Sequence, residues 1–156
     1  MSKINRYSLE KEFENILKVY PYLLDESLVG GRLGNQYKIV LSNGTIRYID
    51  LIYFKKSEII IIELKKEKVL KKHIQQLAEY VESLKKKYPH RKIRGIFAGQ
   101  TLEANLEHSL NLRGFSFRSY FKDIPFELKL CNNCRKVVRI NQSSCKWCNS
   151  ETFLKI

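Results

Sequence analysis

"YIDLIYFKKSEIIIIELKK" (residues 48–66) contains two apolar runs joined by the short polar segment "KKSE". The first run carries one carboxylate, Asp50, and the second carries Glu63, with Lys65 two residues further on. Four isoleucines in succession are typical of a strand that is buried on both faces. We therefore expect a buried β-hairpin with charged groups near its centre.

The register of this hairpin follows from its turn. Pairing Phe54 with Ile59 across the turn places Asp50 opposite Glu63. Directly opposed residues have Cβ atoms about 4.5–5.5 Å apart on one face, and the two-residue period of a strand brings Lys65 to the same face. Two carboxylates this close repel each other unless they share a proton or a cation. The alternative is an exposed sheet face with Lys65 as a surface ion-pair partner, and the isoleucine run argues against it.

A divalent cation between Asp50 and Glu63 is the simplest physical account of this pair. Hard oxygen ligands suit Mg²⁺ or Mn²⁺, which accept few protein ligands and keep several waters. Lys65 would then orient or help deprotonate one of these waters and stabilise charge that develops on a phosphoryl oxygen.

The flanking sequence predicts a mixed α/β fold. Residues 8–24 have helical spacing with Ser8 as the N-cap, and Gly30, Gly31 and Gly34 indicate a loop. Further elements are expected as strands at 36–41, 45–54, 59–64, 92–99 and 115–121, and as helices at 69–87 and 101–114, the last between Thr101 and Gly114. A β meander followed by helix–strand alternation implies a mixed sheet with helices on both sides.

The segment "HIQQLAEY" (residues 73–80) adds polar groups to the helix that follows Lys65. Gln76 and Tyr80 are four residues apart and share one helix face. Their amide and phenol groups are suited to holding a phosphate or a water near a metal, although this spacing also fits an ordinary surface pair. His73 is on the same face, and we expect it to face solvent or touch phosphate rather than bind a metal.

Together these residues resemble the signature of the PD-(D/E)xK nucleases with its Q-x-x-x-Y extension. The match is sharper to the catalytic domain of the archaeal NucS/EndoMS endonucleases, through "FENIL", "RYIDLI", "IIIIELK" and "QLAEYV", and later through "IRGIFAG" and "LEHSLNLRGFSF". The resemblance covers residues 9–117. It implies a restriction-endonuclease-like mixed sheet flanked by helices and a metal-dependent DNA endonuclease.

The resemblance also implies roles for individual residues. Asp50, Glu63 and the Leu64 carbonyl would hold Mg²⁺ or Mn²⁺, and Lys65 would assist catalysis. A glutamate of the first helix would act through a water or a neighbouring ligand; Glu14 is our assignment, with Glu10 and Glu12 as competitors. Gln76 and Tyr80 complete the implied set.

Two departures from that family limit what can be transferred. We expect that the N-terminal DNA-binding and dimerisation domain of NucS/EndoMS is absent and that a cysteine tail is added. Substrate preference is therefore not carried over, and neither is the choice between DNA and RNA. Relatives act as dimers, so a homodimer stays open, since the sequence shows no dimer interface.

The tail carries all the cysteines of the chain, Cys131, Cys134, Cys145 and Cys148, as two C-x2-C pairs separated by ten residues. This spacing predicts two knuckles that complete a four-thiolate structural Zn²⁺ site. Disulfides, free thiols and an iron–sulfur site are the alternatives. We expect a nuclease domain over residues 1–124 and a small zinc ribbon over residues 125–156.

The tail also combines an aromatic side chain with cations, which suits phosphate contact and base stacking. The expected nucleic-acid-binding residues are Arg135, Lys136, Arg139, Lys146 and Trp147. Packing of Trp147 against the main domain is an equally good interpretation.

A net charge of +13 favours a polyanionic partner, here DNA, although a Lys-rich solvated surface would give the same count. No apolar run is long enough to cross a membrane, and the first residues lack a signal-peptide core, so we expect a cytoplasmic protein. A non-catalytic nucleic-acid-binding module and a protein-binding adaptor are the competing functions.

Overall fold

A computed structural model describes residues 11, 14–15, 17–119, 128–139 and 142–155. Its centre is a five-stranded sheet in the order β1-β2-β3-β4-β5. The strands are β1 (Arg32–Val40), β2 (Ile46–Phe54), β3 (Glu58–Val69), β4 (Lys92–Leu102) and β5 (Phe115–Ser119). The pairs β1–β2 and β2–β3 are antiparallel, whereas β3–β4 and β4–β5 are parallel. The sheet is therefore mixed, which confirms the expected fold class.

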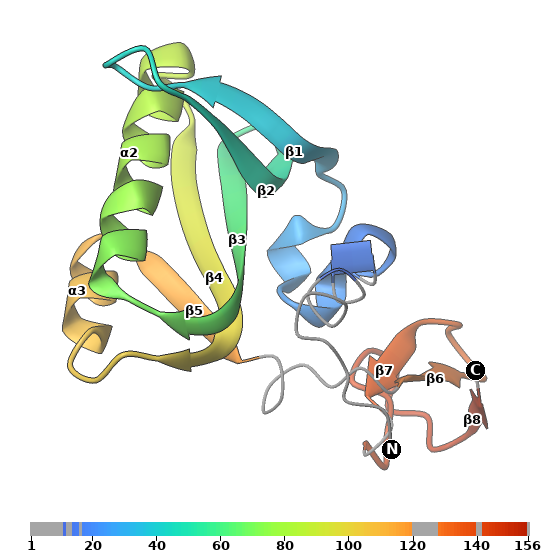
Figure 1. Ribbon diagram of the computed structural model, residues 1–156. Helices are drawn as coiled ribbons and strands as arrows, with labels where there is room; N and C mark the ends of the chain where they lie inside the picture. Colours follow the sequence, from blue (N-terminus) through green and yellow to red (C-terminus); the bar gives the residue numbers. More distant parts are fainter. Residues whose placement is uncertain (1–10, 12–13, 16, 120–127, 140–141, 156) are drawn as a thin grey trace.

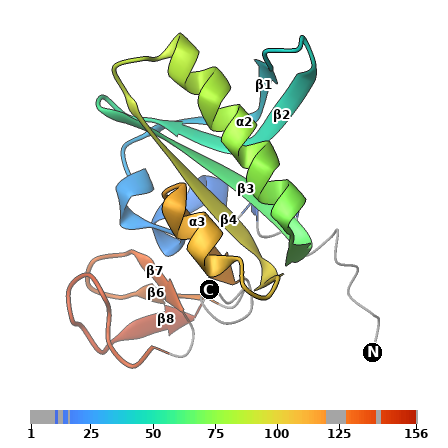
Figure 2. The same ribbon diagram turned by 90° about the vertical axis from the view of Figure 1, so that its left-hand side faces the viewer.

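Helices cover both faces of this sheet (Figures 1 and 2). Helices α2 (Lys71–Lys87) and α3 (Glu107–Leu112) lie on one face. On the other face lie the N-terminal helical residues 11, 14–15 and 17–19 and the 3-10 turns η1 (Pro21–Leu23) and η2 (Glu26–Leu28). Two separate apolar clusters fill the spaces above and below the sheet. No helix in the described part of the chain is long and apolar enough to span a membrane.

The hairpin of β2 and β3 has the register that the sequence predicts. Phe54 pairs with Ile59, and the pairing continues to Leu51 with Ile62. The four isoleucines of β3 are 0% exposed, because α2 covers one face of the strand and the N-terminal helix covers the other. The interpretation of a strand buried on both faces is thus confirmed.

Several element boundaries differ from the sequence-based expectation. Gly34 lies inside β1 rather than in a loop, and an added Cβ there would come within 2.7 Å of the Ile52 side chain, so only a glycine lets this part of the hairpin close. The first helix gives way to the turn η1 because Pro21 follows it. Residues 1–10, including Ser8, lie outside the described part.

The predicted helix at 101–114 is shorter than expected. Thr101 and Leu102 belong to β4, because β3 runs on to Val69 and pairs with them. A register shift between Lys65 and Lys68 accompanies this extension. Helix α3 therefore begins only at Glu107, although it ends before Gly114, as expected.

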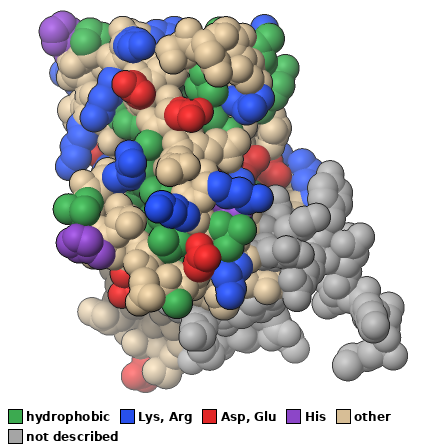
Figure 3. All heavy atoms as spheres, turned by 60° about the vertical axis from the view of Figure 1, so that its left-hand side comes forward, with side chains coloured by type: hydrophobic (Ala, Val, Ile, Leu, Met, Phe, Trp, Pro, Cys, Tyr) green, Lys and Arg blue, Asp and Glu red, His purple; other side chains and the backbone are tan. Residues whose placement is uncertain are grey.

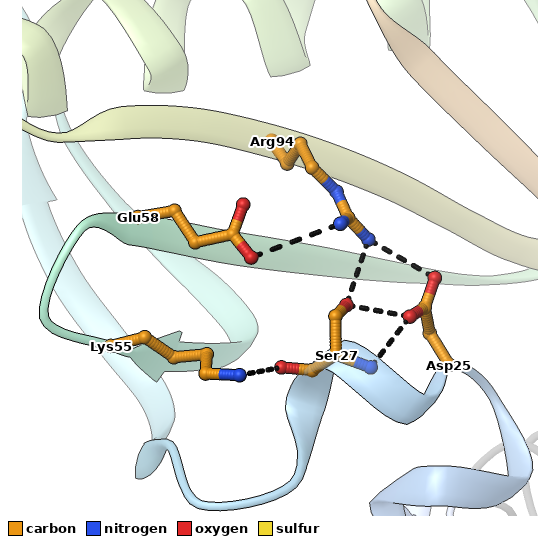
Figure 4. Close-up of polar contacts among 5 residues, drawn as sticks. All are labelled: Asp25, Ser27, Lys55, Glu58 and Arg94. Carbon is orange, nitrogen blue, oxygen red and sulfur yellow. Dashed lines mark hydrogen bonds and ion pairs between the residues drawn. The ribbon is translucent and has the colours of Figure 1, made fainter.

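A polar network joins η2 to the sheet at the start of β3 and β4 (Figure 4). The Arg94 guanidinium lies 3.0 Å from the Asp25 carboxylate and 3.9 Å from the Glu58 carboxylate. Asp25 accepts the Ser27 backbone N–H at 2.9 Å, and Lys55 donates to the Ser27 carbonyl at 2.6 Å. Burial alone would raise the pKa of Asp25, but the Ser27 hydrogen bonds and Arg94 lower it. These contacts fix the turns after the N-terminal helix against the sheet.

A second, three-stranded sheet in the order β7-β6-β8 carries the cysteines. Its strands are β6 (Leu128–Cys131), β7 (Val137–Arg139) and β8 (Phe153–Lys155), and both pairs are antiparallel. We call residues 128–139 and 142–155 the cysteine unit.

Crowding of α2 on β4 gives a stability prediction. A Cβ added at Gly95 would lie 2.8 Å from Leu77 Cδ2 and 2.9 Å from Phe115 Cδ1. We expect Gly95→Ala to lower the free energy of unfolding by about 1–3 kcal/mol, as overpacking does in close-packed cores. Urea denaturation measures this change, with the exposed Ser116→Ala as the control. Equal unfolding midpoints for Gly95→Ala and the wild type would contradict it.

Candidate functional site

Asp50 and Glu63 meet where the backbone ladder between β2 and β3 ends. Beyond the Leu51–Ile62 pair, side chains replace the backbone acceptors. The Leu64 N–H donates to Asp50 Oδ2 at 2.8 Å. The Asp50 N–H donates to Glu63 Oε1 at 3.3 Å. Each carboxylate therefore reaches across to the other strand, and the two acidic groups lie together as the register predicts.

Burial makes both carboxyl groups difficult to ionise. Glu63 is 5% exposed, and burial followed by the Asp50 charge raises its pKa well above 4.5. Burial also raises the pKa of Asp50, while the Leu64 N–H, Gln36 and Lys65 oppose the shift. Lys65 Nζ lies 3.9 Å from Glu63 Oε2. An acidic pair with Glu63 buried and Asp50 half-buried favours a bound proton or cation.

Strand β1 supplies two amides that sequence reasoning missed. Gln36 Nε2 donates to Asp50 Oδ1 at 3.1 Å. Asn35 Nδ2 donates to Glu14 Oε1 at 2.5 Å and to the Asp50 carbonyl at 2.9 Å. The sequence did offer one signal. Asn35 and Gln36 are adjacent polar residues within a strand, and asparagine is depleted in strands. The meaning of this signal depends on contacts with residues far along the chain.

Glu14 is buried, with 6% of its surface exposed, and it joins the site through Asn35. Its charge also raises the pKa of Asp50. Within the described residues, only the four cysteines bring three or more ligand atoms within 4.8 Å of one another. Glu14, Asp50 and Glu63 therefore do not form such a cluster, and Glu14 is linked to Asp50 through Asn35. Glu10 and Glu12 lie outside the described part.

Helix α2 presents Tyr80 to the acidic pair. Tyr80 is 2% exposed, and burial, then the nearby Glu63 charge, raises its pKa to about 12. The Asp50 charge also raises the pKa of Tyr80, whereas the Arg47 charge lowers it. The phenol therefore senses the charges of Glu63, Asp50 and Arg47. Gln76 lies one turn earlier on the same helix and is half-buried.

His73 has a role that the sequence did not predict. The His73 Nδ1 accepts the Leu70 N–H at 2.9 Å, and the His73 backbone N–H donates to the Leu70 carbonyl at 3.0 Å. Burial, together with the charges of Lys65 and Lys72, lowers its pKa. His73 therefore caps the start of α2. Its side chain is still partly exposed, and the expectation that it faces solvent or touches phosphate stays a prediction.

The cysteine unit has the geometry of a four-thiolate centre. The Cys131 and Cys148 sulfurs lie 3.5 Å apart, and those of Cys134 and Cys145 lie 3.6 Å apart. Tetrahedral Zn²⁺ with bonds of about 2.3 Å requires separations of about 3.8 Å, whereas a disulfide requires about 2.05 Å. All four cysteines are free. The residues present thus fit a metal such as zinc.

The two C-x2-C pairs form knuckles with one hydrogen-bond pattern. In the first, the Cys131 N–H donates to the Lys136 carbonyl at 2.9 Å and the Arg135 N–H donates to the Cys131 carbonyl at 3.0 Å. In the second, Cys145 pairs in the same way with Ser150 and Asn149. Arg135 and Asn149 have φ of 65° and 63°. The repeated turn aims both pairs of sulfurs at one point.

Trp147 packs against the turn η1, which follows the N-terminal helix. Its ring meets Tyr22 edge-on, with centroids 5.2 Å apart. Lys136 Nζ lies 4.4 Å and Lys146 Nζ 5.5 Å from the Trp147 centroid, and Lys146 is 3.4 Å from Glu26. The structure thus supports the packing interpretation of Trp147. Arg135 is exposed, and the Arg139 side chain is outside the described part.

A family model assigns this chain to a family, and solved structures share its fold. The family model described as "Endonuclease NucS C-terminal domain" matches residues 10–137. A repair endonuclease from Pyrococcus abyssi is 26% identical over 70% of this chain and 46% of its own, with a TM-score of 0.58. The EndoMS-dsDNA2 complex is 20% identical over 70% of this chain and 43% of its own, with a TM-score of 0.50. The chain spans less than half of these two solved chains, and no curated protein matches it.

Stability should depend on pH through Glu63. Because its pKa is raised above 4.5 in the folded state, the folded protein keeps a proton that the unfolded chain has lost. The stabilising contribution is present below pH 4.5 and is lost as pH rises through the raised value. Without divalent cations other than zinc, Glu63→Gln should therefore gain free energy of unfolding relative to the wild type as pH rises.

Urea unfolding between about pH 5 and pH 8 measures this difference. The exposed Glu107→Gln serves as the matched control and should follow the wild type. Parallel pH profiles for Glu63→Gln and the wild type would contradict the raised pKa.

The cysteine unit also has a built-in probe, because Trp147 is the only tryptophan of the chain. The Trp147 backbone N–H donates to the Cys145 sulfur at 3.4 Å. We expect a strong zinc chelator, or Cys131→Ser, to shift tryptophan emission to longer wavelength as the ring leaves Tyr22. Ser144→Ala is the control, and unchanged emission after complete release of zinc would rule out this coupling.

Proposed function

Because the chain belongs to the family of NucS endonuclease C-terminal domains, we propose that it is a Mg²⁺- or Mn²⁺-dependent endonuclease that hydrolyses phosphodiester bonds in DNA. The observation that carries the proposal is the reciprocal contact of Asp50 and Glu63 across β2 and β3, with Lys65 beside them. The proposal takes these three residues as the PD-(D/E)xK signature that the sequence resembles.

In this proposal Asp50, Glu63 and the Leu64 carbonyl hold the divalent ion. The ion would supply positive charge at the scissile phosphate and activate water for attack at phosphorus. Lys65 orients the attacking water and stabilises negative charge on the phosphoryl oxygens. Its ammonium is already held toward the site by Glu63.

The helix α2 and the N-terminal helix complete the proposed site. The Tyr80 hydroxyl stays protonated at neutral pH, since its pKa is about 12, and is therefore available as a hydrogen-bond donor to phosphate or water. Gln76 offers an amide one turn away. Glu14 acts indirectly, through Asn35.

The charge distribution supports DNA as the substrate. Lysine and arginine side chains are spread over the face formed by α2 and α3, with fewer acidic side chains among them (Figure 3). Lys65 lies beside Glu63. The charges of Lys65 and Lys72 both lower the pKa of His73, and the charge of Arg47 opposes the raised pKa of Tyr80. Cations around a carboxylate pair attract phosphates that the pair alone would repel.

The cysteine unit is proposed to be a zinc ribbon that assists DNA binding, within a division of the chain at residues 1–124 and 125–156. Arg135, Lys136 and Lys146 would contact phosphates. Since Tyr22 already covers one edge of Trp147, the ring is proposed chiefly to dock the ribbon, with base stacking limited to its open side. A homodimer and a cytoplasmic location remain predictions.

The test of the proposed function is cleavage of single-stranded, duplex, mismatched and branched DNA with Mg²⁺, Mn²⁺ or EDTA. We expect cleavage only with a divalent ion and none above background for Asp50→Asn or Glu63→Gln. Lys65→Met should lower the rate by about 10²–10⁴-fold. The exposed Glu107→Gln is the control and should cleave normally. Salt-sensitive DNA binding without cleavage of any substrate would favour a non-catalytic binding module instead.

A further inference from the structure

We propose that the adjacent amides Asn35 and Gln36 of β1 are positioning residues that hold Asp50 for metal binding. The inference rests on the proposed function, because it assigns a role within the same site. Neither residue belongs to the motifs that the chain shares with the PD-(D/E)xK signature, and both lie on a strand that contributes no proposed metal ligand.

Gln36 occupies an unusual backbone conformation opposite Asp50. Asn35 pairs with Leu51 and Tyr37 pairs with Ile49, so Gln36 faces Asp50 without a ladder pair of its own. Its φ is 51°, in the left-handed region that non-glycine residues rarely adopt. Such strain persists only where surrounding contacts enforce it, and it is concentrated at functional sites.

The neighbouring core residues show that the β1–β2 hairpin twists around Gln36 and Asp50. Leu51 packs in the cluster under the N-terminal helix, whereas Ile49 and Ile52 both pack in the cluster under α2. The strict two-residue alternation of β2 is therefore broken around Asp50. On β1, Leu33 and Tyr37 likewise pack with different clusters, although they are four positions apart and regular alternation would place them on one face. The positive φ of Gln36 lies directly opposite the point where the alternation of β2 is broken at Asp50.

This twist lets both Asp50 oxygens be held from opposite strands. Oδ2 accepts the Leu64 N–H of β3 at 2.8 Å, and Oδ1 accepts Gln36 Nε2 of β1 at 3.1 Å. The carboxylate is thereby fixed in rotation, with its remaining lone pairs free for a cation. Removal of Gln36 would leave one oxygen without its partner and the carboxylate free to turn.

Asn35 performs the second part of the same task. Its Nδ2 donates both to Glu14 Oε1 and to the Asp50 carbonyl, and its Oδ1 accepts Lys18 Nζ at 3.4 Å. One amide thus joins the N-terminal helix to the backbone of β2 at Asp50. Partners of this indirect kind typically change metal affinity or activity by about 10–100-fold when removed.

The decisive variant is Gln36→Gly, because glycine accepts the positive φ while it removes the amide. Mn²⁺ affinity of the zinc-loaded full chain, measured by titration calorimetry without DNA, is the readout, with Asp50→Asn as the blank. We expect about 10–100-fold weaker Mn²⁺ binding and a similar loss of cleavage, with an unfolding midpoint equal to or above that of the wild type. The exposed amide variant Asn111→Ala should behave as the wild type.

Each other outcome counts against the inference in a distinguishable way. Wild-type Mn²⁺ affinity in Gln36→Gly would show that the amide does not position Asp50. Weaker binding together with a lower unfolding midpoint would assign Gln36 to folding instead. Equal Mn²⁺ binding by the wild type and Asp50→Asn would overturn the proposed function, and the positioning role with it.

Discussion

Buried Glu63 and half-buried Asp50 lie together at the point where the β2–β3 ladder ends, and the surrounding fold has to make their burial tolerable. An unpaired buried charge is costly, so each carboxylate takes a backbone N–H of the opposite strand in place of the ladder that has ended. Lys65 adds a cation beside Glu63. The end of the β2–β3 ladder and the amides of β1 are consistent with the need to keep these two groups together and partnered.

Contacts at both ends of the sheet hold this arrangement. At one end, the Arg94 network fixes η2 against β3 and β4. Near the acidic pair, Asn35 ties Glu14 to β2. The turns η1 and η2 also contact the cysteine unit, since Tyr22 packs on Trp147 and Glu26 pairs with Lys146. The N-terminal segment therefore connects the sheet, the acidic pair and the cysteine cluster, although the three are far apart in sequence.

Local patterns of sequence predicted the centre of the fold well. The hairpin register, the burial of the isoleucines and the clustering of the cysteines follow from spacing alone, and the structure has all three. The errors arose where distant partners decide the outcome. Thr101 is drawn into β4 by the continuation of β3, and the amides of β1 acquire meaning only from Asp50 and Glu14. The capping contact of His73 was not predicted either, although its partner Leu70 is only three residues away.

The two candidate metal sites differ in ways that keep them chemically separate. The four thiols form a closed, soft donor set that fits zinc and leaves no position for substrate. In the proposed catalytic site, Asp50, Glu63 and the Leu64 carbonyl would offer only three hard oxygen donors, which suit Mg²⁺ or Mn²⁺ and leave positions for water and phosphate. Because donor softness and the number of open positions both differ, the two proposed donor sets would select different ions without a barrier between them. The proposal thus assigns to one chain a metal that stabilises a fold and a metal that serves a reaction.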